Sequence, residues 1–279
     1  MICLVRYAEI ALKGKNRFEF EKKLVQNIKS SFKAASLDAK IKRLPGRFLL
    51  ETEQEPDLRR VFGIVSFSPC IRVEAKMDVL CAEVLELAEK QGKTSTFRIS
   101  ARRLTKELSF SSQEINKQIG AFVVEKKGWK VALEKPELDI GIEIINGEAF
   151  LFTKTIGCFG GLPVGVEGKV LALITDESSA LAALLSMKRG CAIEAAGFAE
   201  QKKSLETLQA FSPNILFFHK IKNASELQEL AKRLRCKAIV VNDTLTHLKA
   251  YPNNMLILRP LMAFCEKEIL AENKKFYNI

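Results

Sequence analysis

The sequence predicts a multidomain α/β protein with a ferredoxin-like domain at residues 1–75, a second α/β domain at 76–156, and, after a linker at 157–168, a Rossmann-like parallel-sheet domain at 169–279. Three observations support this division. The first part has the order β-α-β-β-α-β, the second contains a strong hairpin signal, and the third alternates apolar strands with helices. The chain's 279 residues suffice for about two or three such domains.

In the first domain, apolar patterns predict four strands and two helices. A helix over 17–35 is expected because apolar residues recur at every fourth position, at Phe20, Leu24, Ile28 and Phe32. Pro56 and Asp57 are expected to begin a short second helix that ends near Phe62. The strands are expected at 2–7, from Ile41 to the turn Pro45-Gly46, in FLLET, and across 64–75.

The second domain is expected to combine two helices with a hairpin. One helix follows Met77, TFRISARR alternates as a strand does, and Ser112 is placed to cap the next helix. Asn146-Gly147 stands between the apolar runs ELDIGIEII and EAFLFTKT and predicts a tight hairpin turn. The glycine-rich segment 157–168 is interpreted as a linker.

The third domain alternates strand and helix, which predicts a parallel sheet. The expected strands are VLALI, 192–198, ILFFH and KAIVV, and the expected helices include 176–189, closed by Gly190, and 224–234. The segment MLILRPLMAFCEKEIL forms the end of this domain.

The charge is basic and unevenly distributed. Lys and Arg number 44 against 33 Asp and Glu, for a formal net charge of +11. Residues 1–50 carry +8 and 91–130 carry +6, whereas 51–90 carry −4 and 131–170 carry −3. This arrangement indicates a polyanion-binding surface assembled from two places in the fold. The alternative is that these cations only form solvent-exposed faces of helices.

Several classes of protein are excluded or disfavoured. No apolar run approaches the about 20 residues of a membrane span, and the N-terminus lacks a signal-peptide pattern, so we expect a cytoplasmic protein without membrane contact. Seven widely spaced cysteines contain no CxxC, and the two histidines, His219 and His247, are too few for a histidine metal site or a serine triad. We therefore assign no metal ligand and no catalytic residue.

Four motifs resemble those of the tRNA 4-thiouridine synthetases, the tRNA sulfurtransferases that also serve thiazole synthesis for thiamine. YAEIALKGKNR at 7–17 resembles the family's opening motif, with Ala8 in place of its glycine, and RVFGIVSFSP at 60–69 resembles the next marker. FRISARRLTKELSFSSQEINKQIG resembles a THUMP RNA-binding domain. GGLPVGVEGKVLALI resembles the start of the family's PP-loop domain, so the similarity covers essentially the whole chain.

The resemblance implies that the ferredoxin-like and THUMP domains hold tRNA or another structured RNA, with THUMP on the 3′ acceptor end. The expected contacts are Lys13, Lys15, Arg17, Arg47, Arg98, Arg102, Arg103, Lys106 and Lys154. Arg98 and Arg102 are an even number of residues apart and should share one strand face. The alternative is that some of these cations pair with carboxylates such as Glu9, Glu19 or Glu107.

One family motif is altered. Active members carry Ser-Gly-Gly-x-Asp-Ser here, a loop whose amides wrap the pyrophosphate while ATP adenylates the tRNA uridine. In this chain one residue is missing, Asp176 and Glu177 replace the glycines, and Ser178 replaces the aspartate. Carboxylates would repel a triphosphate, whereas Thr175 or Asp176 suits a helix cap. The residues of this degenerate pocket are Leu173, Ile174, Thr175, Ser178, Ser179 and Phe198.

Other family positions also differ. The family's His-Phe pair is Gly197-Phe198 here, and its Thr-Gly-Glu-Ser-Leu stretch is VNDTL at 241–245. The family's catalytic cysteine follows the Arg-Pro-Leu motif at 259–261 at a greater distance, so we expect no equivalent in this sequence, and no rhodanese domain. Cys236 is expected to be buried, whereas Cys265 lies near a helix start that would lower a thiol pKa.

Three functional hypotheses follow. The first is a tRNA-binding relative that lacks ATP-dependent thiolation and needs no cofactor. The second is an active tRNA sulfurtransferase with ATP in a divergent loop and sulfur from a partner protein. The third is a structural subunit that docks onto another RNA-modification enzyme, and a homodimer is a further possibility.

Overall fold

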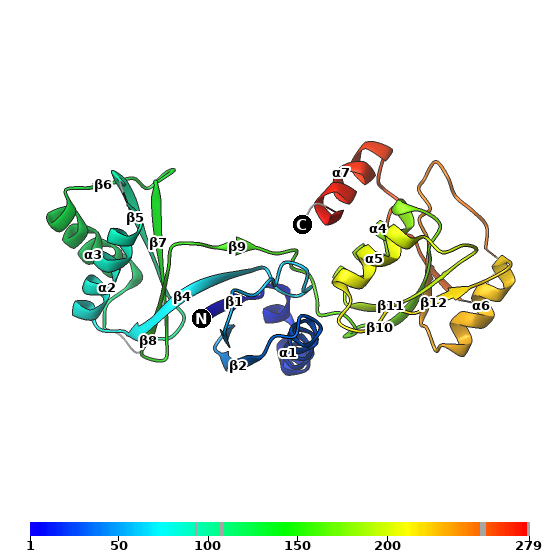
Figure 1. Ribbon diagram of the computed structural model, residues 1–279, viewed down its shortest axis with the longest axis horizontal. Helices are drawn as coiled ribbons and strands as arrows, with labels where there is room; N and C mark the ends of the chain where they lie inside the picture. The colour runs from blue at the N-terminus through cyan, green and yellow to red at the C-terminus, as the bar shows by residue number, and fades with distance from the viewer. Residues whose placement is uncertain (93, 107–108, 252–254, 278–279) are drawn as a thin grey trace. The chain divides into compact units, whose positions relative to one another are not determined.

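The computed structural model describes residues 1–92, 94–106, 109–251 and 255–277, which form two compact units (Figure 1). The first unit comprises Met1–Arg6, Leu37–Pro56 and Ser66–Gly157, and the second comprises Tyr7–Ser36, Asp57–Val65 and Cys158–Ile279. Within the described residues, no helix has the length and apolar content to cross a membrane. The domain boundaries at 75, 156 and 168 stay a prediction.

The first unit is built on one mixed sheet with the order β2-β3-β1-β4-β8-β7-β5-β6, and β9 pairs with β4. Its strands are β1 (Ile2–Arg6), β2 (Ala39–Leu44), β3 (Arg47–Thr52), β4 (Ser66–Glu74), β5 (Thr96–Arg103), β6 (Lys130–Val131), β7 (Leu138–Ile145), β8 (Glu148–Phe152) and β9 (Ile156–Gly157). The strands expected from apolar patterning are confirmed.

Strand β4 joins two parts of this sheet (Figure 1). Residues 66–70 of β4 pair antiparallel with β1, and residues 71–74 pair antiparallel with β8. The strands of the expected ferredoxin-like domain and those of the expected second domain are therefore parts of one hydrogen-bonded sheet.

Two helices, α2 (Met77–Lys90) and α3 (Ser112–Lys127), pack on one face of strands β5, β7 and β8 (Figure 1). The predicted cap of α3 is wrong by one residue. The Ser111 hydroxyl accepts from the Glu114 amide at 3.2 Å, and the Glu114 carboxylate accepts from the Ser111 amide at 2.6 Å. This reciprocal pair fixes the helix start, while the Ser112 hydroxyl accepts from the Arg103 amide at 3.2 Å.

The hairpin between β7 and β8 confirms the Asn-Gly prediction. Asn146 and Gly147 have φ values of 52° and 76°, the left-handed pair that a type I′ turn requires. This turn sets the register in which Ile142 lies opposite Leu151, with both side chains in the core under the helices.

The second unit contains a parallel sheet with the order β12-β11-β10-β13-β14, which confirms the Rossmann-like prediction. Its strands are β10 (Gly168–Leu173), β11 (Cys191–Gly197), β12 (Phe218–Lys220), β13 (Ala238–Val240) and β14 (Leu256–Leu258). Its helices are α1 (Arg17–Ala34), α4 (Glu177–Lys188), α5 (Lys202–Phe211), α6 (Ala224–Arg233) and α7 (Glu266–Tyr277), and two 3-10 turns lie at Glu9–Leu12 and Gly14–Asn16.

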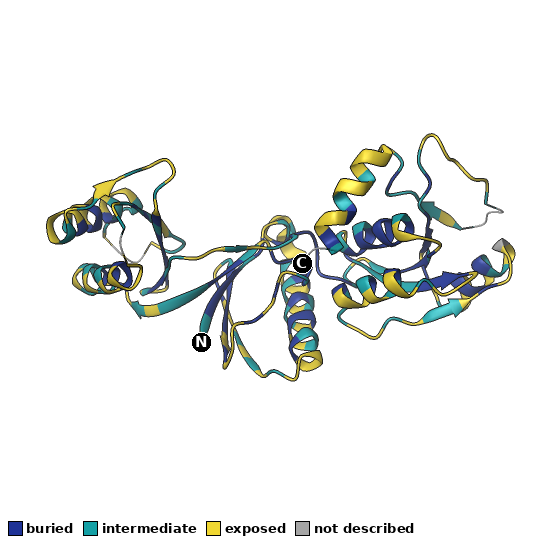
Figure 2. Ribbon diagram, turned by 45° about the horizontal axis from the view of Figure 1, so that its top comes forward, coloured by how far each residue is buried: buried dark blue, intermediate teal, exposed yellow. Residues whose placement is uncertain are grey.

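Helices cover both faces of this sheet. Residues of α4, α5 and α7 share one core with alternate residues of β10, and residues of α6 share a second core with the intervening ones. Figure 2 shows the central strands and α4 as buried and α7 as largely exposed.

Residues 158–168 of the glycine-rich segment belong to the second unit and pack within it. The ring of Phe159 stacks on Phe276 with centroids 4.4 Å apart. Gly161 has a φ of +79°, and a Cβ there would lie 2.2 Å from the carbonyl oxygen of Lys188. Glycine at position 161 therefore allows the backbone of this segment to approach the backbone of Lys188 closely.

The short helix predicted between the third and fourth strands is wrong, because side-chain hydrogen bonds fold this segment into turns. The Asp57 carboxylate accepts from the amide of Arg59 at 3.1 Å and from its guanidinium at 2.9 Å. Gly63 then has a φ of +102°, and its amide donates to the carbonyl of Gly160 at 2.8 Å.

Phe62 lies at the centre of an aromatic cluster in the second unit, with its centroid 5.2 Å from Phe211 and 6.1 Å from Phe159. Phe62→Ala should lower the free energy of unfolding by about 3–5 kcal/mol, because it leaves a cavity in the core. The matched control, Phe198→Ala, removes a ring that is 47% exposed and should cost less than about 1 kcal/mol. Urea denaturation measures both, and equal losses would contradict this assignment.

Candidate nucleic-acid interface and nucleotide loop

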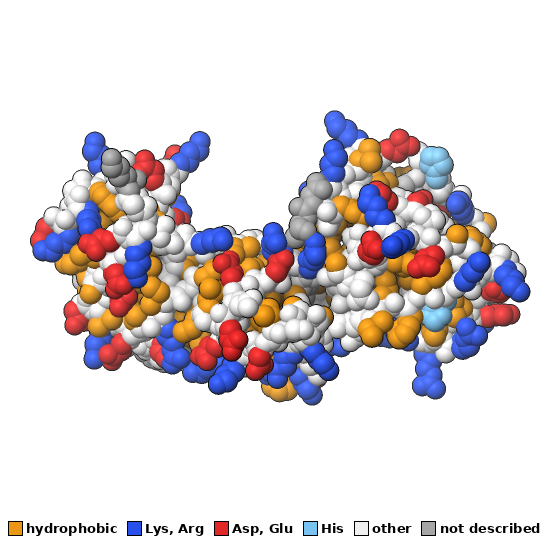
Figure 3. Space-filling model, in the orientation of Figure 1, with side chains coloured by type: hydrophobic (Ala, Val, Ile, Leu, Met, Phe, Trp, Pro, Cys, Tyr) orange, Lys and Arg blue, Asp and Glu red, His pale blue; other side chains and the backbone are white. Residues whose placement is uncertain are grey.

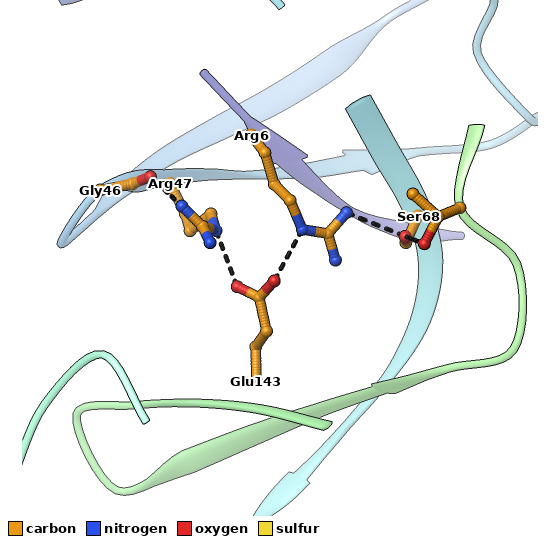
Figure 4. Close-up of polar contacts among 6 residues, drawn as sticks. Arg6, Gly46, Arg47, Ser68 and Glu143 are labelled. Atoms are coloured by element: carbon orange, nitrogen blue, oxygen red, sulfur yellow. Dashed lines mark hydrogen bonds and ion pairs between the residues drawn. The ribbon is translucent and has the colours of Figure 1, made fainter. Parts of the chain in front are cut away.

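In the first unit, one buried carboxylate is held between two arginines from other strands (Figure 4). Glu143 on β7 accepts from Nε of Arg6 on β1 at 2.6 Å and from Nε of Arg47 on β3 at 2.7 Å. Arg6 also donates through Nη1 to the hydroxyl of Ser68 on β4 at 2.9 Å. The exposed fractions of the three charged side chains are 13% for Arg6, 9% for Arg47 and 7% for Glu143.

The ionisation of Glu143 follows from these contacts. Burial alone would raise the pKa of its carboxyl, but the hydrogen bonds and charges of Arg47 and Arg6 outweigh burial and hold the pKa below its usual value. The carboxylate is therefore charged at neutral pH, and it neutralises one of the two guanidinium charges beside it.

Arg47 was predicted to contact RNA; the structure places its side chain in the interior, and the RNA contact itself stays a prediction. Besides its bond to Glu143, its guanidinium donates to the carbonyl of Gly46 at 2.8 Å. Its position on β3 turns the side chain inward, where it is buried. Arg47 is thus a structural partner of Glu143.

An open pocket of about 420 Å³ lies beside Glu143. Its lining includes residues of β5, β7 and β8 and of the segment after β8, among them Ser100, Arg102, Asp139, Gly141, Phe152 and Thr155. Arg98, Ser100 and Arg102 lie opposite Asp139, Gly141 and Glu143 in the parallel β5–β7 register, which confirms that Arg98 and Arg102 share a strand face. This is the face opposite the one that α2 and α3 cover.

Phe152 forms one wall of this pocket, and Gly141 makes room for it. A Cβ on Gly141 would lie 2.2 Å from the Phe152 ring. The guanidinium carbon of Arg6 stands 4.6 Å from the centroid of the same ring. The ring is therefore held between the β7 backbone and a cation of β1.

The other predicted cations of the first unit differ in availability. Arg98 pairs with Asp139 and donates to the carbonyl of Leu133 at 2.8 Å. Lys154 is exposed and lies 3.4 Å from Glu55. Two further cations, Arg102 and Lys106, are exposed, and Arg103 is partly buried. Glu107, proposed as an alternative partner, lies outside the described residues.

The predicted cations of the opening motif lie in the second unit. Arg17 pairs with Glu21 at 2.7 Å and donates to the hydroxyl of Tyr7 at 2.7 Å. Burial and the hydrogen bond with Glu21 raise the pKa of Tyr7 to about 12, so this phenol stays protonated and donates to Glu21. Arg17 therefore organises the motif.

The neighbours of Arg17 are more accessible. Lys15 is exposed, and Lys13 lies 3.8 Å from Glu167 with its ammonium 4.7 Å from the ring centroid of Phe20. Glu9, an expected partner of these cations, pairs instead with Arg189 at 2.8 Å. On the face drawn in Figure 3, Lys and Arg side chains are interspersed with Asp and Glu in both units.

The loop between β10 and α4 is closed by its own side chains. The Asp176 carboxylate accepts from the amide of Ser179 at 2.8 Å and from the hydroxyl of Ser178 at 2.7 Å. The Ser179 hydroxyl accepts from the amides of Thr175 at 2.8 Å and Asp176 at 3.0 Å. Of the two caps that the sequence left open, Thr175 and Asp176, the structure shows Asp176.

Asn242, which follows β13, completes this network. Its amide group donates to the Ser178 hydroxyl at 2.7 Å and to the two Asp176 carboxylate oxygens at 3.2 and 3.3 Å. Loop amides are thus engaged within the chain, and a carboxylate stands at the helix N-terminus, where an anionic ligand would bind. Of the remaining predicted loop residues, Ile174 is buried and Phe198 is exposed.

The two cysteines considered as sulfur carriers have different surroundings. Cys236 is buried as expected, and desolvation raises the pKa of its thiol to about 11. Cys265 is exposed at the start of α7, and its amide donates to the carboxylate of Glu268 at 2.9 Å. A carrier role for Cys265 stays a prediction.

Sequence reasoning missed Glu143. The signal for it is a charge between isoleucines in the apolar run LDIGIEII, since a buried carboxylate requires a cation. The partners could not be assigned from sequence because Arg6 lies 137 residues and Arg47 lies 96 residues away along the chain.

Comparisons with known proteins agree with this architecture. The model of the ThiI ferredoxin-like domain matches residues 2–68, and that of the THUMP domain matches residues 74–154. A protein of Methanocaldococcus jannaschii described as a probable tRNA sulfurtransferase is 31% identical, over 99% of this chain and 87% of that protein. The chain belongs to the tRNA sulfurtransferase family.

Other members and structures extend this likeness. A tRNA sulfurtransferase relative from Thermococcus kodakarensis is 28% identical, over 98% of this chain and 87% of its own length. The crystal structure of PH1313 from Pyrococcus horikoshii is 30% identical with a TM-score of 0.85, and covers 100% of this chain and 99% of that one. A 4-thiouridine synthetase crystallised with RNA and bound ATP shares the fold, with 24% identity and a TM-score of 0.80 over 99% of this chain and 85% of that one.

In this family member, the Glu143 cluster should make stability depend on pH in acid. Folding lowers the pKa of the Glu143 carboxyl. The contribution of this carboxylate to the free energy of unfolding is therefore complete above the unfolded pKa of about 4.3, and it is lost as pH falls through the folded pKa. Glu143→Gln should cost about 3–5 kcal/mol at pH 7, and this cost should shrink as pH falls below about 4. Urea denaturation across pH tests this, and a cost that is constant from neutral to acid pH would contradict it.

Proposed function

We propose that this protein binds tRNA through its ferredoxin-like and THUMP domains and does not itself carry out ATP-dependent adenylation and thiolation. One observation supports the second part: the Asp176 carboxylate accepts hydrogen bonds from Ser178 and Asn242, in the loop that by the family resemblance would wrap a pyrophosphate. Membership of the tRNA sulfurtransferase family and the THUMP match support the first part.

The exposed cations give the RNA proposal its physical basis. Lys15, Arg102 and Lys106 project into solvent, and lysines and arginines of this kind bind phosphates with release of counterions. The pocket beside Arg102 adds hydroxyl groups and an aromatic wall, which suit ribose and unstacked bases. The crystal structure of an RNA complex of the structurally similar 4-thiouridine synthetase supports the same class of ligand.

Electrostatics also supports the closed loop. The N-terminus of α4 carries a partial positive charge and free amides, which is why such ends bind phosphate groups. Here Asp176 already supplies the anion and occupies the amide of Ser179, and Glu177 adds a second negative charge in the first turn. A triphosphate would have to displace the first carboxylate and approach the second.

An active tRNA sulfurtransferase is the second candidate. The likeness to the M. jannaschii relative over 99% of this chain favours it. This reading requires ATP to displace Asp176 from the loop, sulfur from a partner protein, and a carrier thiol such as the exposed Cys265. Docking onto another modification enzyme and homodimer formation stay predictions.

RNA binding is tested with charge-removing variants. Combined replacement of Lys15, Arg102 and Lys106 by Ala should weaken tRNA binding at least about tenfold and reduce the salt slope by about one for each lost phosphate contact. The control removes three exposed cations around α6, Lys222, Lys232 and Arg233, and should change affinity less than about threefold. Failure of the wild-type protein to bind tRNA at about 50 mM salt would end the proposal.

Calorimetry with ATP and Mg²⁺ separates the two candidates. The closed loop predicts no binding heat up to millimolar ATP, because the anion site is internally occupied. An active 4-thiouridine synthetase serves as the positive control under the same conditions. Micromolar affinity for ATP in this protein would establish the second candidate over the first.

A further inference from the structure

We propose that Glu143 is a positioning residue for RNA binding: by holding Arg6 and Arg47 together, it fixes the bend between strands β1–β4 and strands β5–β8 on which the RNA-binding face is built. This inference rests on the proposed RNA-binding function and deepens it. The residues that carry it all belong to the first unit.

The strand order shows that the ion pairs require a bent sheet. Between β7, which carries Glu143, and β1, which carries Arg6, lie β8 and β4, and β3 with Arg47 is one strand further. At about 4.8 Å per strand, a flat sheet would separate β7 from β3 by about 19 Å, beyond the combined reach of the two side chains. The observed 2.7 Å between Arg47 Nε and Glu143 Oε2 is possible only when the sheet curls toward this face.

Apolar packing accompanies the ion pairs at the same bend. Side chains of β1–β3 share one small core with side chains of β7 and β8, namely Leu4, Leu44 and Leu49 with Ile145 and Phe150. Apolar contact resists separation but has little directional preference. The two charge-assisted hydrogen bonds to one carboxylate supply that direction.

The bend also shapes the pocket. Ser68 on β4 has its hydroxyl 3.1 Å from that of Thr155, a lining residue, and Arg6 on β1 stands over the ring of Phe152, another lining residue. Movement of β1 and β4 would therefore displace the wall opposite Arg102. Without the carboxylate, Arg6 and Arg47 would face each other as buried like charges and favour an open sheet.

A pair of variants with opposite charge changes tests this role. Glu143→Gln raises the net charge by one and Arg47→Gln lowers it by one. If the cluster acted only through its charge, Glu143→Gln would tighten binding to tRNA and Arg47→Gln would weaken it. The positioning role instead predicts that both variants weaken tRNA binding about tenfold or more and both reduce the salt slope.

Two controls separate positioning from general damage. Glu86→Gln removes an exposed carboxylate that pairs with Lys90 within α2 at 2.6 Å, and should leave tRNA affinity within about twofold. A four-nucleotide single-stranded RNA is too short to contact both parts of the sheet, so its affinity should change less than about twofold in every variant. Titration of each variant with tRNA at concentrations well above the dissociation constant gives the fraction of the protein that is folded and able to bind.

Glu143→Asp, which keeps the charge but shortens the side chain, replaces the glutamine variant if that variant does not fold.

Wild-type or tighter tRNA affinity in folded Glu143→Gln, or in Glu143→Asp where it is used instead, would overturn the inference. A parallel loss of tetranucleotide and tRNA affinity would also overturn it. Absence of tRNA binding by the wild-type protein would instead refute the proposed function, so the two failures are distinguishable.

Discussion

A carboxylate buried at a sheet bend must be neutralised, and this requirement shapes the first unit. Glu143 pairs with Arg6 on β1 and Arg47 on β3, two strands that in a flat sheet would lie too far from β7 for these ion pairs to form. The curvature of the sheet, the pocket beside Arg102 and the burial of Arg47 accompany these ion pairs. The surface available for a polyanion is therefore set by an internal ion cluster as well as by exposed charge.

In the second unit, a carboxylate bonds to neighbouring loop residues instead of to arginines from distant strands. Asp176 occupies the helix N-terminus of a parallel α/β sheet, at the carboxyl ends of the strands where such folds commonly bind ligands. The side chain is an internal anion with its own hydroxyl and amide partners, Ser178 and Asn242. The loop between β10 and α4 is thus a helix start that its own side chains cap.

Local features of this chain could be predicted from sequence because local contacts decide them. The four-residue spacing of apolar side chains in α1, the Asn146-Gly147 turn and the cap at Asp176 need only neighbouring residues. The prediction of a short helix near Pro56 was wrong because the Asp57 carboxylate accepts hydrogen bonds from Arg59, which favours turns. The burial of Arg47 could not be predicted because it depends on a residue 96 positions away along the chain.

Ultraviolet cross-linking of bound tRNA, followed by mass spectrometry, tests the central claim most directly. The claim is that the exposed cations beside the bent sheet and in the opening motif hold the RNA, while the loop at 174–180 holds no nucleotide. The account predicts cross-linked peptides from 96–106 and 13–17, and identical cross-linking with and without ATP. Cross-links confined to the second unit's parallel-sheet loops, or a pattern that changes when ATP is added, would contradict it.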